Sequence, residues 1–234
     1  MNGNEARPKL SVVMPAFNEG REIEHSVAEL VKALDRSGYS YEILVVDDGS
    51  IDLTAEIARD LGADVFRHER TLGKGAALRT GFQWARGEIV VTLDADLSHD
   101  PAEIPALIEP LLETDADLVI GTRFSRGANI KPYAINWVQR LANVLLSGLV
   151  SLLTGISISD SLSSFRAYRR EALEELKFHS QGAEAEAEII LKTANSGRDI
   201  CEVPVTFRAR PAKEVASAGL SVLKTIITFL VRGR

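Results

Sequence analysis

The fold is decided by Ile89-Val90-Val91-Thr92-Leu93-Asp94-Ala95-Asp96, where an apolar run passes directly into two carboxylates. β-branched residues favour strands, and a short apolar run with polar ends is typical of a buried strand. A second such run, Tyr41–Val46, ends in the pair Asp47-Asp48. The two stretches together predict buried strands whose carboxyl ends carry acidic side chains.

Strand and helix patterns alternate around these two stretches. Strands are predicted at residues 10–14, 41–46, 63–66, 88–93 and 117–121, and helices at 22–34, 52–61, 74–85 and from 101 onward. This alternation favours a mostly parallel sheet with helices on both faces, which binds ligands where its strands end. We therefore predict an α/β fold whose site gathers residues 15–19, 47–48, 94–96 and 122–123 on one rim.

The second half is less regular. Its patterns predict helices at residues 137–154, 170–176 and 183–195, and strands at 163–168 and 199–203. Residues 141–159 have no charge but are too rich in polar side chains and glycine for a typical membrane span. Residues 220–231 place leucine and isoleucine on one helical face. Each segment is predicted to lie on a membrane surface or to pack as an ordinary buried helix.

Length and composition limit the classes of function. The 234 residues suit one large domain, which we place at residues 1–212 with an interfacial helix at about 134–156, followed by an amphipathic helix at 213–234. A net charge of -6 argues against nucleic acid as a partner. The single cysteine, Cys201, and the polar start of the chain predict a cytoplasmic location.

The acidic strand ends suggest specific chemistry. Asp94 and Asp96 can share a divalent cation with a diphosphate, and oxygen ligands favour Mg²⁺ or Mn²⁺. Asp47 and Asp48 can accept hydrogen bonds from a nucleobase or from ribose hydroxyls. The plainer alternatives are a solvated acidic turn and an Asp-Gly turn.

Lys74 lies in a glycine-rich stretch, Leu72-Gly73-Lys74-Gly75, at the start of a predicted helix. The spacing is not that of a P-loop, and no GxGxxG follows the first strand, which argues against a dinucleotide dehydrogenase. The glycines can instead allow a close approach of the helix to the sheet or to a sugar. Lys74 remains a candidate for binding a ligand at this rim.

In this order the motifs resemble family 2 glycosyltransferases of the GT-A fold, and most strongly their dolichol-phosphate mannose synthase subgroup. The matching segments are PAFNE (15–19), VVDDGS (45–50), LGKGAALRTG (72–81), LDADLSHDPxxI (93–104), GTRF (121–124), DSLSSFR (160–166), Glu188, EVPV (202–205) and Arg210. Two departures are Ser164, where that family usually has glycine, and residues 211–214, which lack its usual GESK.

The resemblance implies a role for each matching residue. The nucleoside would be lined by Pro15, Ala16, Phe17, Glu19 and Asp47 or Asp48. The donor diphosphate and its metal would lie against Asp94, Ala95 and Asp96, with Ser98 where a third metal-site residue stands. The acceptor phosphate would be held by Arg123, Arg140 and Arg210, which together with Asp96 form the catalytic set.

The implied reaction is inverting transfer of a hexose, with mannose favoured and glucose next, from GDP-mannose or a UDP-sugar to dolichyl or polyprenyl phosphate. The enzyme would act on the cytoplasmic face of a membrane as a peripheral protein. A phosphate with a second pKa of about 6 is already a nucleophile at neutral pH, so we assign no base and expect His99 to be structural or a minor helper.

Three alternatives remain open from the sequence. A family 2 enzyme acting on a sugar hydroxyl would need a base, for which Asp160 or Glu188 could serve. A non-catalytic nucleotide-sugar binding subunit would not need the intact Asp94, Asp96 and Arg123. A nucleotidyltransferase should carry a basic, glycine-rich loop after the first strand, where this chain has residues 16–19, Ala-Phe-Asn-Glu.

Overall fold

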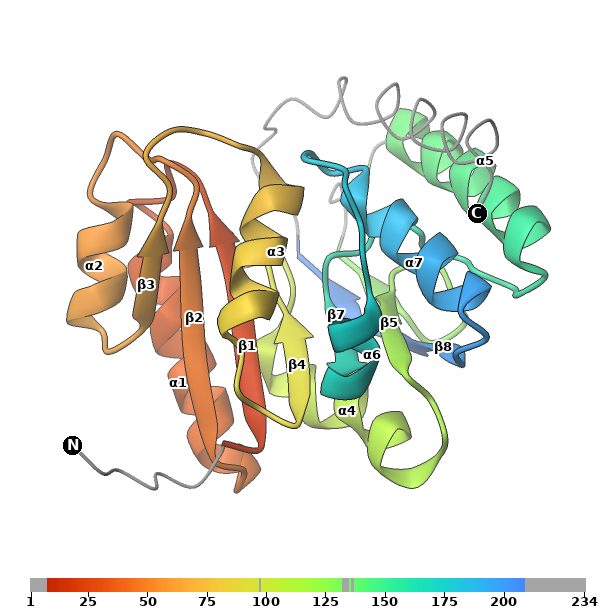
Figure 1. Cartoon of the computed structure of the whole chain (residues 1–234), viewed down its shortest axis with the longest axis horizontal. Helices are drawn as coiled ribbons and strands as arrows, with labels where there is room; N and C mark the ends of the chain where they lie inside the picture. Colours follow the sequence, from red (N-terminus) through yellow and green to blue (C-terminus); the bar gives the residue numbers. More distant parts are fainter. Residues whose placement is uncertain (1–7, 97, 132–134, 136, 209–234) are drawn as a thin grey trace.

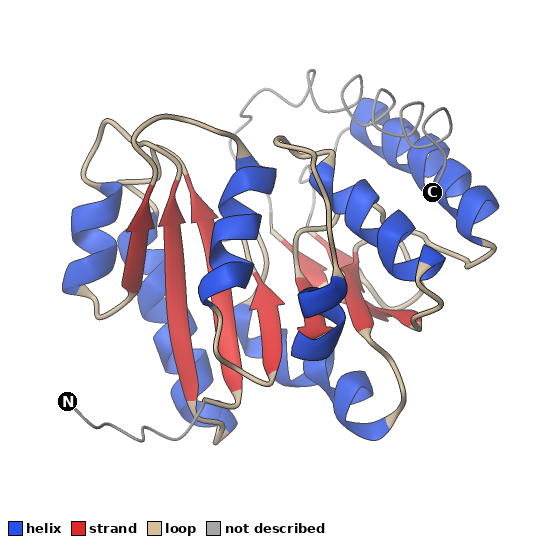
Figure 2. Cartoon of the chain, in the orientation of Figure 1, coloured by secondary structure: helices blue, strands red, loops and turns tan. Residues whose placement is uncertain are grey.

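A computed structural model describes residues 8–208, except for residues 97, 132–134 and 136. Arg210 and the predicted helix at 213–234 lie outside these residues. Figure 1 shows helices flanking one central sheet, with the same elements coloured by type in Figure 2. The α/β fold expected from the alternating patterns is confirmed.

The central sheet has seven strands in the order β3-β2-β1-β4-β7-β5-β8. They are β1 (Leu10–Ala16), β2 (Tyr41–Asp47), β3 (Asp64–Arg67), β4 (Ile89–Thr92), β5 (Leu118–Thr122), β7 (Arg166–Arg169) and β8 (Ile200–Pro204). All neighbouring pairs are parallel except those of β7, which runs antiparallel to both β4 and β5. The parallel strands therefore end on the same rim, as the sequence predicts.

Helices cover both faces of this sheet. One face packs against α1 (Ile23–Ser37), α2 (Thr54–Asp60) and α4 (Ile104–Glu113), which follows the short 3-10 turn η1 (Pro101–Glu103). The other packs against α3 (Lys74–Trp84), α5 (Trp137–Thr154), α6 (Arg170–Glu175) and α7 (Ala185–Asn195). Neighbouring positions of β1 alternate between the two cores, since Val12 belongs to the first and Val13 to the second.

A second, two-stranded sheet joins β6 (Asn129–Ile130) to β9 (Thr206–Phe207). An isolated bridge also pairs Phe207 with His99. The sequence patterns do not predict this sheet, because two-residue strands carry too little periodicity to be recognised. It brings the end of the described chain beside the segment that follows Asp96.

Helix α5 lies against α7 on the outer side of the molecule (Figure 1). Several large apolar side chains on it are exposed: Trp137, Leu141, Val144, Leu145 and Leu152. Within the described residues, no helix combines the length and apolarity needed to cross a membrane.

Candidate functional site

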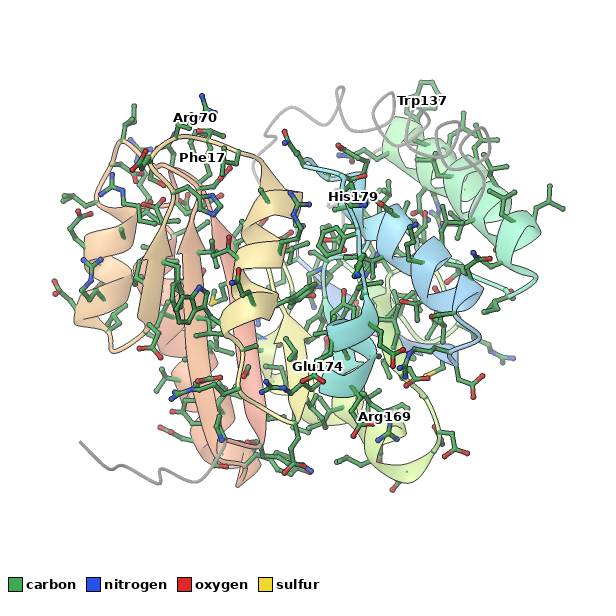
Figure 3. The ribbon with its side chains drawn as sticks, in the orientation of Figure 1. Phe17, Arg70, Trp137, Arg169, Glu174 and His179 are labelled. Carbon is green, nitrogen blue, oxygen red and sulfur yellow. The ribbon has the colours of Figure 1, made fainter. Side chains whose placement is uncertain are left out.

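The predicted site residues gather where the parallel strands end. Phe17 follows β1, Asp48 follows β2, and Arg123 follows β5. In the view of Figure 3, Phe17 and Arg70 lie at this upper rim, and Trp137 lies at the same level across the molecule. The topology therefore collects side chains from distant parts of the sequence on one edge.

Asp94, the first carboxylate of the Asp94-Ala95-Asp96 motif, is held by two partners. Lys74 Nζ lies 2.8 Å from Asp94 Oδ1, and Ser164 Oγ donates to Asp94 Oδ2 at 2.7 Å. Burial alone would raise the pKa of Asp94, but the charge of Lys74 and these two hydrogen bonds lower it to about 2. Asp94 is therefore an anion at any physiological pH. Asp96, the second carboxylate, accepts the main-chain N–H of Ser98 at 2.9 Å.

Lys74 also reaches an acidic residue that sequence reasoning missed. Its Nζ lies 3.2 Å from Glu186 Oε1, and Arg166 Nη1 lies 3.3 Å from Glu186 Oε2. Glu186 and Arg166 are both buried, so their charges are kept by mutual pairing. Burial would lower the pKa of Lys74, but Asp94 and Glu186 raise it above its ordinary value. The result is a half-buried cation that lies beside Asp94, where the diphosphate is predicted to bind.

The start of α3 fixes the place of Lys74. The Gly75 N–H donates to the Gln181 carbonyl at 2.6 Å, and Arg79 Nη1 donates to the Ser180 carbonyl at 2.6 Å. A Cβ atom at Gly75 would lie 2.3 Å from that same Ser180 oxygen. Gly75 therefore allows close packing of α3 against the turn before α7, whereas the sequence pattern predicted a close approach to the sheet or to a sugar.

Asp47 and Asp48 are both buried and engaged with the protein itself. Asp48 accepts from the main-chain N–H groups of Leu72 and Gly73 at 2.9 and 2.7 Å, and contacts His68 Nδ1 at 2.7 Å. Asp47 lies 3.1 Å from Arg67 Nε. These carboxylates shape the loops that follow β2 and β3, and Asp48 holds the loop that leads to Lys74.

An open hollow of about 710 Å³ lies beside this pair, lined by Gly49, Ser50, Ile51, Arg67, His68 and Glu69. Its size and position suit a nucleoside. Of the residues predicted to line the nucleoside, Phe17 is 43% exposed, Pro15 is half-buried, and Ala16 and Glu19 are buried. Arg67 and His68 were missed because no motif marks the end of β3.

Arg123, predicted to hold the acceptor phosphate, is fixed by a bidentate pair. Its Nε and Nη2 donate to Asp160 at 2.6 and 2.7 Å, and its main-chain N–H donates to Asp160 at 3.0 Å. The guanidinium lies over the rings of Phe124 and Phe207, at 5.5 and 5.0 Å. Arg140 also lies over the Phe124 ring, 5.9 Å from its centre. Two of the three predicted arginines therefore converge, and Arg210 lies outside the described residues.

His99 packs against Phe165 and Phe207, with ring centres 5.2 Å apart in both cases. Burial and the charge of Arg123 lower the pKa of His99 to about 3. The imidazole is therefore neutral at physiological pH, and it lies close to the charges of both Arg123 and Asp94. This agrees with the structural role expected of His99.

The two carboxylates considered as bases for a hydroxyl acceptor are both occupied. Asp160 is fully buried and bound to Arg123. Glu188 accepts the main-chain N–H groups of His179 and Ser180 at 2.8–3.1 Å. Both carboxylates are therefore engaged with partners inside the protein.

The carboxylates at the end of β4 fit a hard divalent cation. Within the described part of the chain, no group of three or more His, Cys, Asp or Glu side chains forms a closed metal site. Mg²⁺ is commonly held by one or two carboxylates together with substrate phosphates, and Asp94 and Asp96 supply such a pair.

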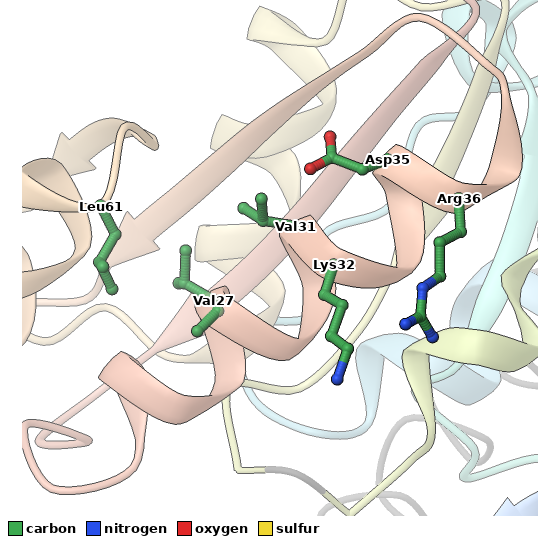
Figure 4. A pocket seen from close by; sticks show the side chains of 7 residues that line it. Val27, Val31, Lys32, Asp35, Arg36 and Leu61 are labelled. Carbon is green, nitrogen blue, oxygen red and sulfur yellow. The ribbon is translucent and has the colours of Figure 1, made fainter.

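Another hollow, of about 500 Å³, lies beside α1 and the end of α2 (Figure 4). It is lined by Val27, Ala28, Val31, Lys32, Asp35, Arg36 and Leu61. None of the predicted site residues lines it. This hollow is therefore not part of the predicted site.

Comparisons with known proteins agree with this geometry. The sequence profile described as Glycosyl transferase family 2 matches residues 11–177. The chain is 33% identical over 226 residues to a dolichol-phosphate mannosyltransferase of Pyrococcus furiosus, covering 95% of this chain and 62% of that protein. It is 34% identical over 230 residues to an undecaprenyl-phosphate 4-deoxy-4-formamido-L-arabinose transferase of Edwardsiella ictaluri, covering 95% of this chain and 66% of that protein. The chain thus spans about two thirds of the length of these two relatives.

Among solved structures, it resembles glucosyl-3-phosphoglycerate synthase from Mycobacterium tuberculosis. The TM-score is 0.76 and the identity 27%, over 97% of this chain and 80% of that one. That structure contains Mn²⁺, uridine diphosphate and glucosyl-3-phosphoglycerate. Its fold supports the GT-A assignment of the central sheet.

Proposed function

From the premise that this chain belongs to glycosyl transferase family 2, we propose that it transfers a hexose from a nucleotide-sugar to a polyprenyl or dolichyl phosphate. Mannose is the favoured hexose and glucose the next. The observation that carries the proposal is the convergence of Arg123 and Arg140 on Phe124. A guanidinium is well suited to phosphate, and two on one ring favour an anionic acceptor.

The relatives support this acceptor, because the names of two of them specify dolichol phosphate and undecaprenyl phosphate. The solved relative is named for a phosphoglycerate acceptor instead. Each of these acceptors carries a phosphate group, which agrees with an arginine-lined acceptor side. The choice among them rests on what lies next to that side, which here is the apolar face of α5.

The residues divide the chemistry into two tasks. Asp94 and Asp96 would hold Mg²⁺ or Mn²⁺, which when bound neutralises charge on the departing nucleoside diphosphate. Lys74 would contact the diphosphate from the other side. Arg123 and Arg140 would hold the acceptor phosphate in line with the anomeric carbon, so that positioning supplies much of the rate. In-line attack inverts that carbon, and an α-linked donor gives a β-linked lipid phosphosugar.

No protein base is needed for this scheme. A phosphate monoester is mostly dianionic at neutral pH, and its oxygen attacks without losing a proton to the enzyme. The engagement of Asp160 and Glu188 supports this assignment over transfer to a sugar hydroxyl. A product with a retained α linkage would contradict it.

The outer face of α5 is proposed to lie on a lipid surface, where an acceptor with a bilayer-embedded tail presents its phosphate. Trp137, Leu141 and Leu145 are 76, 50 and 65% exposed, which is unusual for large apolar residues on one helix. Apolar side chains on one helical face are typical of interfacial helices. Replacing Leu145 by aspartate should reduce partition into liposomes, with Ile51→Asp as the matched control because Ile51 is also apolar and exposed but lies away from α5.

The deciding experiment supplies the chain with radiolabelled GDP-mannose, UDP-glucose or UDP-N-acetylglucosamine, together with a polyprenyl phosphate and Mn²⁺. Label recovered in the lipid extract, and lost on mild acid hydrolysis, is the expected result. A water-soluble sugar acceptor serves as the comparison arm. Label entering only that acceptor would favour the hydroxyl-acceptor alternative, and no transfer from any donor would favour a binding subunit.

A further inference from the structure

Three polar side chains of α5 contact the protein interior, while several large apolar side chains of the same helix are exposed. Asn143, Ser147 and Ser151 recur every four residues and therefore lie on one side of the helix. Asn143 and Ser147 are each only 2% exposed. These three residues, the polar stripe of α5, are among the polar and glycine positions that made the segment a poor membrane span.

The polar stripe binds a single short segment, residues 158–161, which we call the Asp160 segment. Asn143 Nδ2 donates to the Ser159 carbonyl at 2.7 Å. The Ser161 N–H donates to Ser147 Oγ at 2.9 Å, and the Ile158 N–H donates to Ser151 Oγ at 2.9 Å. Each turn of the stripe thus holds a different residue of the segment.

Glu202 of β8 holds the same segment from the other side. Its carboxylate accepts the main-chain N–H groups of Ser159 and Asp160 at 3.0 Å and the Ser159 hydroxyl at 2.7 Å. The main chain on which Asp160 sits is therefore fixed both by the sheet and by α5. Asp160 in turn is fully buried and makes the bidentate pair with Arg123.

We propose that the polar stripe of α5 is a positioning element for Arg123, acting through the Asp160 segment. The helix whose outer face is offered to a lipid surface would then also orient the guanidinium that receives the acceptor phosphate. What Arg123 binds rests on the proposed function. The mechanical link itself depends only on the hydrogen bond from Asn143 to the Ser159 carbonyl, the main chain from Ser159 to Asp160, and the hydrogen bonds between Arg123 and Asp160.

The sharpest variant is Asn143→Leu, which keeps the side-chain size and removes the donor to Ser159. The matched control is Thr154→Val on the same helix, because Thr154 Oγ1 accepts from the Ile156 N–H and donates within the helix to Val150, without touching the Asp160 segment. Circular dichroism and thermal melts establish that each variant folds. If Asn143→Leu does not fold, Ser147→Ala is measured in its place.

The first readout does not involve any substrate. The Nε–H of Arg123, bonded to Asp160 at 2.6 Å, should give a slowly exchanging ¹⁵Nε signal, assigned by its loss in Arg123→Lys. Asn143→Leu should shift this signal and speed its exchange with water, while Thr154→Val leaves it unchanged. An unchanged signal in a folded Asn143→Leu protein would overturn the proposal.

The second readout uses polyprenyl phosphate in vesicles and the donor found active with the wild type. Asn143→Leu should raise the KM for polyprenyl phosphate about tenfold, because small misplacements of a positioning group are costly, and leave the donor KM and vesicle binding within twofold. In an Arg123→Ala background the same change should add nothing. An equal rise in both KM values would indicate a merely structural role. A wild type without lipid transfer would refute the proposed function, while the NMR arm would still decide the positioning role.

Discussion

The two halves of the site are built in different ways. On the donor side, Asp47 ends β2, while Asp48 and Asp94 lie within two residues of the ends of β2 and β4, so the strands themselves bring these carboxylates to the rim. On the acceptor side, Arg123 is placed by a buried carboxylate that lies 37 residues away in the sequence. The comparison teaches that local strand geometry is enough to gather anions for a cation and a nucleotide. Holding the Arg123 guanidinium in place for the second substrate required additional side chains from elsewhere in the sequence.

The halves also differ in how charge is compensated. On the donor side, Lys74 is shared between Asp94 and Glu186, so a positive charge already lies where a diphosphate is expected. On the acceptor side, the charge of Arg123 is neutralised by Asp160, and only part of the guanidinium group remains to bind a ligand. Donor binding can therefore proceed by moving one flexible lysine, whereas acceptor binding meets a rigid, preformed group.

The largest expected effect tests the donor half. Asp96→Asn removes one charge of the carboxylate pair and should lower metal-dependent transfer about 10²–10³-fold, as the loss of one key electrostatic group commonly does. Steady-state assays across a Mn²⁺ series would measure it. Asp115→Asn, in the exposed turn before β5, is the matched control and should retain full activity. If a folded Asp96→Asn protein transferred sugar at the wild-type rate, the proposed cation site at Asp94 and Asp96 would be contradicted.

A second prediction concerns Gly75, where α3 packs against the turn before α7. Gly75→Ala places a Cβ 2.3 Å from the Ser180 carbonyl and 2.8 Å from Ala185 Cβ, so α3 must move away from the turn before α7. Such overpacking should cost about 1–3 kcal/mol of unfolding free energy and should also displace Lys74. Chemical denaturation measures the first consequence, and the KM for the donor measures the second.

The matched control for Gly75 is Gly148 on α5, where a Cβ would meet nothing within 4 Å. Gly148→Ala should be neutral or stabilise the protein by up to about 1 kcal/mol, because alanine is the better helix former. Equal destabilisation by the two substitutions would show that α3 gains nothing from its close approach. Stabilisation by both would contradict the close packing of Gly75 against Ser180.

The same contrast explains what the sequence could predict. Apolar runs that end in Asp47-Asp48 and Asp94-Ala95-Asp96 identified the parallel strands and the rim, because strand period and polarity are local properties. Asp160, by contrast, was matched to a family segment but was considered as a base. Nothing near it in the sequence shows that Arg123 and Glu202 would use its carboxylate and its main chain.

Other misses have the same origin. Glu186 lies in a run of alternating Glu and Ala, 184–188, where no local signal separates the carboxylate that meets Lys74 from the two other glutamates. Ser164 was noted only as a departure from a glycine, and its hydrogen bond to Asp94 comes from β7 being inserted antiparallel beside β4. Partners brought together by strand order cannot be deduced from periodicity.

The last prediction concerns His99 and the pH dependence of the free energy of unfolding. His99 has a pKa of about 3 in the folded protein against 6.5 for an ordinary histidine, because it is buried beside Arg123. As the pH falls below 6.5, the unfolded chain binds a proton that the folded protein does not, so stability must fall. The expected slope is about 1.4 kcal/mol per pH unit between about pH 6 and pH 4. The contribution of Asp94 is lost only below about pH 4, since its pKa falls from 3.8 to about 2 on folding.

Denaturant unfolding of the wild type and of His99→Gln at several pH values isolates this contribution, because the remaining histidines titrate equally in both proteins. The difference in unfolding free energy between the two should change by about 1.4 kcal/mol per pH unit over that window. A constant difference would mean that His99 accepts its proton while folded. His99, which packs between Phe165 and Phe207, would then carry a positive charge beside Arg123. The acceptor side would contain two adjacent cations, rather than the single guanidinium that Asp160 holds.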